Sequence, residues 1–328
     1  MSFFRLLILL VATLVLNAAA AAEASAEQDG YQVWLEDFRR DALQAGISPE
    51  TLQQALAEMQ QPLPRVVERD RSQPETTQTV AAYVEARLDG TRIAEGQRML
   101  RRYPTWLGRV ENRYAVQRRF IVALWGLESH YGEYTGSFPI LRSLATLAWD
   151  GRRGAYFRQE LLAALKILDA GHVHPENMKG SWAGAMGQCQ FMPSSFLAYG
   201  VDADGGGRID LWATVPDVLA STANYLARHG WQDDQTWGRP VRLPEDFDIG
   251  LAGLDTRQPL ARWQQLGVRR SNGRALPRRN LEASLLVPDG VGGPAYLVYD
   301  NFRVLLKWNR SIAFAVAVGT LADRLQEE

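Results

Sequence analysis

The sequence predicts a mainly α (α+β) fold, with a small β-containing insertion near the C-terminus. Hydrophobic residues recur at helical spacing in successive stretches between residues 31 and 230. Residues 239–300 then contain six prolines and many glycines around short apolar runs. With 328 residues, 46% hydrophobic and 22% charged, the composition is that of a globular protein with two or three sub-domains.

Residues 1–26 are predicted to be a secretory signal peptide. Arg5 supplies the positive end, Leu6–Leu16 the apolar stretch, and Ala24-Ser25-Ala26 a cleavage site. A membrane anchor is the alternative, but so short an apolar stretch falls well below the roughly 20 residues that a membrane span needs. No cysteine directly follows this stretch, so a lipoprotein attachment is not expected. We therefore expect a periplasmic protein without a stable membrane anchor.

Residues 27–103 are predicted to form an N-terminal helical domain. Ser48 is the expected N-cap of one helix, with Pro49 at its first position. A proline-containing connector follows at 61–75. A second helical pattern runs from Thr79 to Tyr103 and is interrupted near Gly90.

The remaining elements divide into three predicted segments. Residues 104–238 carry helical patterns at 114–128, 156–168 and 215–229, the last with Gly230 as its stop. Residues 239–300 carry strand-like runs at 241–243, 284–287 and 295–299, with a brief helix at 259–267. Residues 301–328 close the chain with a buried helix, Ile312–Leu325, for which Asn309 and Ser311 are cap candidates.

Glu128 ends the apolar run that opens "ALWGLESHYGEYTGSF" (123–138). On the predicted helix it shares a face with Ile121, Leu124 and Trp125. Burial on this side and the negative end of the helix dipole both raise the pKa of a carboxyl group. A carboxylic acid that stays protonated near neutral pH can act as a general acid. The alternative is a glutamate that turns to solvent or pairs with an arginine, and periodicity alone does not separate the two.

The block "KGSWAGAMGQCQFMPSSFLAYG" (179–200) is rich in glycine and other small residues, which allow close approach of a ligand or of another backbone. Ser181, Gln188 and Gln190 are polar side chains of short reach, suited to orienting hydroxyls or an acetamido group. The commoner use of such glycines is a tight turn that packs helix on helix. Cys189 is expected to be a small core residue.

The segment "DADGGGRIDLW" (202–212) has features of a calcium-binding loop. Asp202 and Asp204 take positions 1 and 3, and Arg208 takes position 7, where the backbone carbonyl binds. Asp217 could close the site. Gly206 stands at position 5 without the usual carboxylate, so a flexible turn is the favoured alternative.

Other kinds of site find less support. The net charge of −1 gives no reason to expect nucleic acid or an anionic membrane surface as partner. His172 and His174 have no evident third ligand, so a solvated loop is the better interpretation. Ten Trp and eleven Tyr exceed what a core needs, and their flat rings suit sugar faces.

Several blocks together resemble the lytic murein transglycosylase B family, bacterial enzymes that cut the glycan strands of peptidoglycan. They are "WGLESHYG" (125–132), "LATLAWDGRRGAYFRQEL" (144–161), "NMKGSWAGAMGQCQFMPSSF" (177–196), "VDADGGGRIDLW" (201–212), "ANYLARHGW" (223–231) and "NRS" (309–311). The resemblance implies a lysozyme-like catalytic core at 104–238, which the segment 301–328 completes. It also implies that peptidoglycan strands are a partner. A cell-wall synthase is a candidate partner.

The resemblance assigns roles to individual residues. The single catalytic carboxylate of the family corresponds to Glu128. The substrate-binding residues that it implies are Tyr83, Ser181, Gln190, Tyr225 and Asn309. The family's calcium loop falls on 202–217, where Gly206 departs from the pattern. Phe314 stands where relatives often carry tyrosine, so a role for it in sugar binding is not expected.

The implied reaction cleaves the β-1,4 bond between N-acetylmuramic acid and N-acetylglucosamine without water, and no cofactor is required for it. Glu128 would act first as acid and then as base, and 1,6-anhydro-N-acetylmuramic ends would form. One alternative is a lysozyme-type hydrolase, which needs a second carboxylate such as Glu133 or Asp150. Another is a peptidoglycan-binding protein without catalytic activity.

Overall fold

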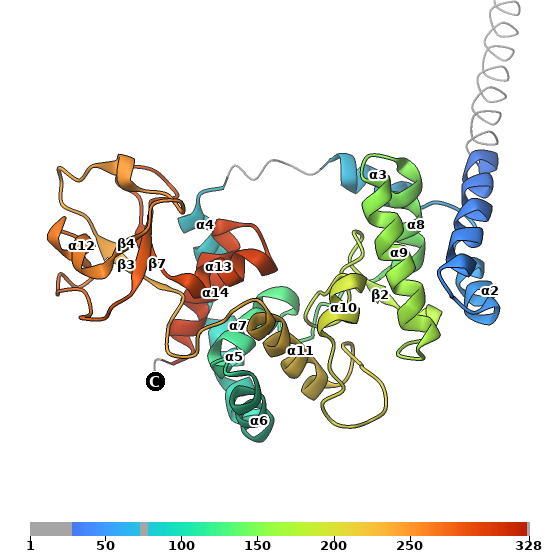
Figure 1. Ribbon diagram of the computed structural model, residues 1–328, viewed down its shortest axis with the longest axis horizontal. Helices are drawn as coiled ribbons and strands as arrows, with labels where there is room; N and C mark the ends of the chain where they lie inside the picture. The colour runs from blue at the N-terminus through green and yellow to red at the C-terminus, as the bar shows by residue number, and fades with distance from the viewer. Residues whose placement is uncertain (1–27, 73–77, 327–328) are drawn as a thin grey trace, which may run out of the picture. The chain divides into compact units, whose positions relative to one another are not determined.

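The computed structural model describes residues 28–72 and 78–326, so the predicted signal peptide lies outside the described residues (Figure 1). The described chain forms two compact units. The first contains the N-terminal helices with 136–186 and 191–197; the second contains the rest, including 187–190 and everything from 198 onwards. Helices dominate both units and the second also carries a small sheet, which confirms the predicted fold class. The units are discontinuous, whereas the segments predicted from sequence are consecutive.

The first unit is built from helices and one short strand pair. Its elements are a helix at 28–44, α2 (Pro49–Ala57), α3 (Pro64–Arg71), β1 (Phe138–Pro139), α8 (Ile140–Asp150), α9 (Gly154–Asp169), η1 (Pro175–Asn177), β2 (Lys179–Gly180) and the start of α10 (Pro193–Tyr199). Ser48 caps α2 as predicted, since its hydroxyl accepts the Thr51 N–H at 3.2 Å. Buried Asp70 accepts hydrogen bonds from Arg152 (2.7 Å) and Arg153 (3.1 Å), which joins α3 to the α8–α9 turn.

The second unit surrounds one buried helix, α7. Its helices are α4 (Val80–Arg87), α5 (Gly90–Arg102), α6 (Pro104–Tyr114), α7 (Arg118–Ser129), α11 (Val215–Arg228), α13 (Asp300–Trp308) and α14 (Ile312–Arg324). Every residue of α7 from Phe120 to Gly126 is buried, and α5, α6, α11 and α14 pack against it. The break predicted near Gly90 is confirmed, because Asp89 caps α5 by accepting the Arg92 N–H at 2.7 Å.

The helix predicted from residue 114 is wrong at its start. Ala115 takes a left-handed conformation (φ 53°) that ends α6, and α7 begins at Arg118. Glu111 stabilises the break, since its carboxylate accepts the Arg118 backbone N–H (3.1 Å) and Nε–H (2.7 Å). A side chain seven residues upstream thus replaces the missing cap, a tertiary effect that periodicity does not register.

The predicted β-containing insertion is confirmed as a five-stranded antiparallel sheet in the order β4-β6-β7-β3-β5. Its elements are β3 (Gly238–Arg242), η2 (Ile249–Leu251), β4 (Gln258–Pro259), the predicted short helix α12 (Leu260–Gln265), β5 (Arg269–Arg270), β6 (Glu282–Leu286) and β7 (Ala295–Val298). Trp263 and Leu285 lie in its separate hydrophobic core.

Among the described helices, none alone has the length and apolar composition to cross a membrane. The helices α13 and α14 reach that length and composition only when they are taken together, and the chain bends by 119° between them.

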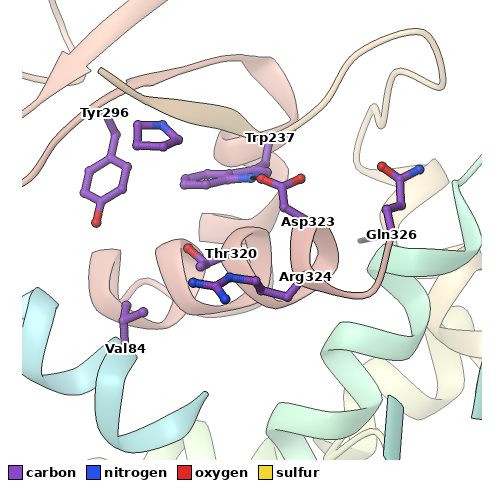
Figure 2. Close-up of a pocket in the computed structure, with 8 residues that line it drawn as sticks. Val84, Trp237, Tyr296, Thr320, Asp323, Arg324 and Gln326 are labelled. Carbon is purple, nitrogen blue, oxygen red and sulfur yellow. Dashed lines mark hydrogen bonds between the residues drawn. The ribbon is translucent and has the colours of Figure 1, made fainter. Parts of the chain in front are cut away.

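A cavity of about 770 Å³ lies beside the sheet and α14 (Figure 2). Trp237, Tyr296 and Asp323 contribute to its lining, and Asp323 accepts hydrogen bonds from Trp237 (2.9 Å) and Arg119 (2.7 Å). None of the predicted site residues lines it. The cavity therefore does not mark the predicted site.

A substitution at Gly126 in α7 tests how tightly the turn after this helix is packed. An added Cβ would lie 2.5 Å from the Tyr131 ring. We expect Gly126→Ala to lower the free energy of unfolding by about 1–3 kcal/mol in urea denaturation. Gly108 in α6 has no atom within 4 Å of an added Cβ, so Gly108→Ala should stabilise by roughly 0.5–1 kcal/mol. Equal effects of both substitutions would contradict this packing.

Candidate active site

Glu128 lies in the last turn of α7, where a single indole contacts its carboxyl group. Trp308, the last residue of α13, donates its Nε1–H to Glu128 Oε1 at 2.7 Å. The Glu128 side chain is half-buried, with protein packed densely around its carboxyl group. Burial raises the pKa of Glu128 to about 7, and the hydrogen bond from Trp308 opposes that rise. Such a carboxyl group can donate a proton near neutral pH and accept one afterwards.

Tyr83 on α4 is close enough to Glu128 to interact with it electrostatically. Burial raises the pKa of the Tyr83 hydroxyl, the guanidinium groups of Arg87 and Arg92 lower it, and the charge of Glu128 raises it. The guanidinium carbon of Arg87 lies 4.3 Å from the centre of the Tyr83 ring. The structure thus brings together two residues that are 45 positions apart and were both predicted as site residues.

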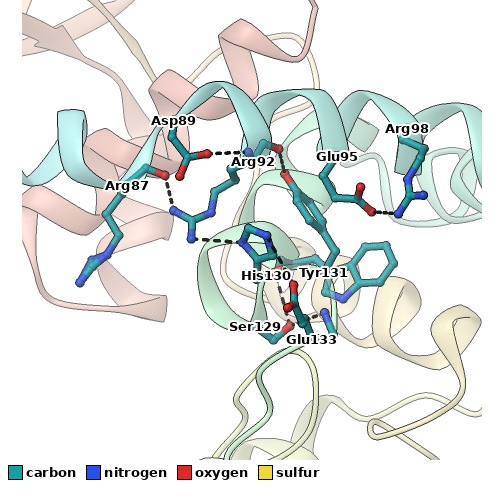
Figure 3. Close-up of polar contacts among 11 residues, drawn as sticks. Arg87, Asp89, Arg92, Glu95, Arg98, Ser129, His130, Tyr131 and Glu133 are labelled. Atoms are coloured by element: carbon teal, nitrogen blue, oxygen red, sulfur yellow. Dashed lines mark hydrogen bonds and ion pairs between the residues drawn. The ribbon is translucent and has the colours of Figure 1, made fainter.

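A turn with a strained backbone follows Glu128 and is hydrogen-bonded to α5 (Figure 3). His130 and Tyr131 both have positive φ, 51° and 60°. Arg92 donates through Nη2 to His130 Nδ1 at 3.3 Å, and its carbonyl accepts the Tyr131 hydroxyl at 2.8 Å. Both contacts connect the turn directly after the candidate acid to α5.

Gln188 ties the end of α7 to the glycine-rich block. Its Oε1 accepts the indole N–H of Trp125 at 2.9 Å, and its Nε2 donates to the Trp212 carbonyl at 2.8 Å. The Ser129 hydroxyl donates to the Gln188 carbonyl at 2.6 Å. Gln188 is buried, so its side chain serves to hold these elements together and is not open to a ligand.

Gln190 belongs to the same unit as Glu128 and has an unusual backbone conformation, with φ 51°. Its Nε2 donates to the Thr135 carbonyl (3.0 Å) and to the Gly187 carbonyl (2.8 Å). The side-chain amide is thereby oriented in advance, and a role in positioning a ligand stays a prediction. Cys189 beside it is buried, as predicted for a core residue.

Ser181 belongs to the first unit and forms part of a tight turn. Its hydroxyl accepts the Ala185 N–H at 2.9 Å, and its own N–H donates to the Ala185 carbonyl at 2.8 Å. Gly136 and Gly180 approach so closely that a side chain on Gly136 would meet the Gly180 backbone. The structural interpretation of the glycines therefore holds for this part of the block, and a contact of Ser181 with substrate stays a prediction.

Tyr225 is almost fully buried, and its hydroxyl donates to the Lys307 carbonyl at 2.7 Å. The imidazole of His229 stacks on its ring with centroids 4.1 Å apart, and Trp308 meets the ring edge-on at 4.8 Å. Tyr225 thus supports the indole that contacts Glu128. Asn309 follows that indole and is exposed; its Oδ1 accepts the Ser311 N–H at 3.0 Å.

The two carboxylates considered as partners of Glu128 have other neighbours. Glu133 is exposed and lies 3.7 Å from His130 Nε2. Asp150 belongs to the first unit, where it accepts a hydrogen bond from Arg71 at 2.7 Å. These contacts give no support to a second carboxylate acting with Glu128.

Asp202, Asp204 and Asp217 each offer a carboxylate oxygen, and these oxygens lie within 4.8 Å of one another. Asp202 accepts the N–H groups of Gly205 (2.9 Å) and Gly207 (2.8 Å), which closes the loop. The charges of Asp202 and Asp204 contribute to the raised pKa of buried Asp217, after burial itself. This mutual repulsion suits a cation, and the donor oxygens are those calcium prefers. The Arg208 side chain points to Asp210, 3.7 Å away.

A buried helix that ends in a carboxyl group of raised pKa, set in a mainly helical fold, is the arrangement of a lysozyme-like glycan-cleaving domain. The chain belongs to the transglycosylase SLT domain family, whose sequence model matches residues 30–323. Within that family it is similar to membrane-bound lytic murein transglycosylase B of Escherichia coli (strain K12), with 37% identity over 235 residues. That match covers 67% of this chain and 60% of the relative, so the chain spans less than two thirds of the relative's length.

Two solved structures show the same fold over nearly the whole chain. SltB3 from Pseudomonas aeruginosa, in complex with NAG-anhNAM-pentapeptide, has a TM-score of 0.88 and 50% identity, with coverage of 90% of this chain and 79% of SltB3. Escherichia coli Slt35, in complex with calcium, has a TM-score of 0.76 and 30% identity, covering 89% of this chain and 92% of Slt35. These matches confirm that the chain is lytic murein transglycosylase B-like, as its sequence blocks predicted.

Proposed function

We propose that this protein is a lytic transglycosylase that cleaves the β-1,4 bond between N-acetylmuramic acid and N-acetylglucosamine in peptidoglycan. The products would carry 1,6-anhydro-N-acetylmuramic ends. One observation carries the proposal: the carboxyl group of Glu128 has a pKa raised to about 7 and receives an indole N–H, whereas Glu133 and Asp150 contact His130 and Arg71. The complex of the similar SltB3 with NAG-anhNAM-pentapeptide supports the choice of substrate.

The proposed reaction needs one carboxyl group in two roles. Protonated Glu128 donates its proton to the glycosidic oxygen as the bond from C1 to that oxygen breaks. The resulting carboxylate then removes the proton of the muramic C6 hydroxyl, whose oxygen forms the new bond to C1. Glu128 ends protonated, as it began, and water is neither consumed nor released. The muramic acetamido group would assist at C1.

The substrate-binding residues of the proposal are Tyr83, Ser181, Gln190, Tyr225 and Asn309. Gln190 is held by two hydrogen bonds and Tyr83 interacts with Glu128, which supports positioning roles for both. His229 covers one face of the Tyr225 ring, so a sugar would meet its edge rather than that face. Ser181 and Asn309 are proposed from the family resemblance alone.

Cleavage in water enriched in oxygen-18 tests the mechanism. The anhydro-forming reaction takes its new oxygen from the substrate, so the ends released from peptidoglycan should carry no label. A lysozyme-type hydrolase would place one labelled oxygen at each new muramic end. A protein that only binds peptidoglycan would release no fragments.

We also propose that the loop 202–217 binds calcium in a structural role, while the reaction itself needs no cofactor. Asp202, Asp204 and Asp217 would supply the ligands, with the Arg208 carbonyl as a further donor. Millimolar calcium should raise the Tm above its value in chelator, by an amount that grows with the ion concentration. Asp204→Asn should remove this increase. A Tm insensitive to calcium would favour a turn that Asp202 closes by itself.

The proposed substrate implies a location where peptidoglycan is found. A periplasmic location fits the signal peptide predicted at 1–26 and a substrate in the cell envelope. Peptidoglycan strands are the proposed partner, and a cell-wall synthase is a candidate partner.

A further inference from the structure

Trp308 is held so firmly that its indole N–H has a defined direction. It is the last residue of α13, directly after Lys307, whose carbonyl accepts the hydroxyl of buried Tyr225 at 2.7 Å. The Tyr225 ring meets the indole edge-on, with centroids 4.8 Å apart and an interplanar angle of 71°. The ring of His229 stacks on the Tyr225 ring. The 2.7 Å hydrogen bond to Glu128 is therefore formed by a pre-positioned donor.

We propose that Trp308 is a positioning residue that confines the acidic proton of Glu128 to Oε2. This inference rests on the proposed function, because it concerns the group that would act as acid and base. An indole nitrogen can only donate, so the oxygen that it contacts must accept. The carbonyl-type oxygen of a protonated carboxyl group accepts better than its hydroxyl oxygen. Oε1, which receives the indole N–H, therefore takes the carbonyl role and Oε2 carries the proton.

The same donor serves the second half of the reaction. Once Glu128 has given up its proton, the indole N–H stabilises the carboxylate against the dense packing around it. Trp308 thus keeps the acid from becoming too weak to protonate a leaving oxygen, and it leaves Oε2 as the oxygen that exchanges protons.

The helices that pack against α7 or α14, and α14 itself, carry other titratable groups, most of which pair with residues other than Glu128. They include Tyr83 on α4, Arg92 and Glu95 on α5, Glu111 on α6, Tyr225 on α11 and Asp323 on α14. Arg92 donates to His130, Glu95 accepts from Arg98, Glu111 from Arg118, and Asp323 from Arg119 and Trp237. Tyr83 interacts electrostatically with Glu128. Its hydroxyl keeps its proton at neutral pH, since its ordinary pKa is 10.0 and burial raises that pKa further.

Trp308→Phe tests the inference because it keeps the ring against Tyr225 and removes only the N–H donor. The alkaline limb of the kcat/KM profile, which reports protonated Glu128, should move up by about one pH unit, as expected when a hydrogen bond to a charged group is lost. At pH 6 kcat should fall by roughly tenfold while KM changes by less than about twofold. Trp308→His restores an N–H group that is two bonds from Cγ, as in tryptophan. This variant should return the alkaline limb of the kcat/KM profile to its original pH or to a lower pH.

Trp263→Phe is the matched control. It removes another buried indole hydrogen bond, to the Ala283 carbonyl at 3.0 Å, in the core of the sheet. It should leave the pH profile of cleavage where it is in the unsubstituted protein. A limb that moves equally in Trp263→Phe and Trp308→Phe would overturn the inference, because the shift would then reflect general loosening.

A titration by NMR separates this inference from the proposed function, since it needs no activity. The ¹³Cδ resonance of Glu128, assigned with Glu128→Gln, should titrate at higher pH in Trp308→Phe than in the unsubstituted protein. In the unsubstituted protein the indole ¹H–¹⁵N signal of Trp308 should shift with the same midpoint as that carboxyl group. An indole signal that stays constant through the titration, or an unchanged ¹³C midpoint in Trp308→Phe, would overturn the inference even if anhydro products form. Absence of anhydro products alone would count against the proposed function only.

Discussion

Glu128→Gln is expected to lower the rate of peptidoglycan cleavage by at least about 10³-fold and to leave peptidoglycan binding intact. General acid–base catalysis contributes roughly 10²–10⁴-fold in a single role, and the proposal gives Glu128 both roles. The amide is close in size to the carboxyl group, and its oxygen can still accept the Trp308 N–H, so the packing around α7 should survive. Release of soluble fragments from purified peptidoglycan measures the rate, and co-sedimentation with it measures binding.

Glu133→Gln is the matched control for that experiment. Glu133 lies five residues further on, is exposed and has His130 as its neighbour. The rate of peptidoglycan cleavage by Glu133→Gln should therefore stay within about threefold of the rate of the unsubstituted protein. Unchanged cleavage by Glu128→Gln would remove Glu128 from the mechanism. Equal losses in both variants would instead favour a hydrolase with two carboxylates.

Glu128→Gln should also stabilise the protein above neutral pH. The pKa of Glu128 rises from its ordinary 4.5 to about 7 on folding, so the folded state holds its proton where the unfolded state has released it. Stability is therefore lost as the pH rises from about 4.5 to 7, by up to about 3 kcal/mol at 1.36 kcal/mol per pKa unit. Glutamine has no proton to lose and avoids this cost.

Urea denaturation of both proteins at pH 4, 6 and 8 measures the effect. The two free energies of unfolding should agree at pH 4, and the variant should exceed the unsubstituted protein by about 1–3 kcal/mol at pH 8. Glu133→Gln should differ from the unsubstituted protein by less than about 0.5 kcal/mol at every pH. A gap that is constant with pH would mean that the Glu128 carboxyl group is not buried in solution. The expected gap is the stability sacrificed for a reactive group.

The sequence was sufficient to predict those elements whose signals are local. Ser48 and Pro49 mark the start of α2, and the apolar runs of 239–300 became strands of one sheet. The start of α7 was not predictable in this way, because Glu111 stabilises it from the preceding helix. The two units were not predictable either, since residues 136–186 return to the N-terminal helices across a long sequence interval.

The candidate site shows the same division. Glu128 could be selected from its place at the end of an apolar helix and from the family blocks around it. Trp308 could not be selected in this way, although it directly precedes the block "NRS" (309–311), because no spacing rule links residues 180 positions apart. Gln188 was noted as a polar residue of the glycine-rich block, but its buried contacts with Trp125 and Trp212 depend on tertiary packing. A tryptophan beside a motif residue is the signal that could have pointed to Trp308.

The mass of the new muramic ends tests the central claim most directly. Purified peptidoglycan would be digested with the unsubstituted protein, and the fragments would be separated and weighed by mass spectrometry. One carboxyl group acting as acid and then base predicts 1,6-anhydro-N-acetylmuramic ends, each lighter by one water than a reducing end. Reducing N-acetylmuramic ends as the main product would contradict the account, because they require water activated by a second group.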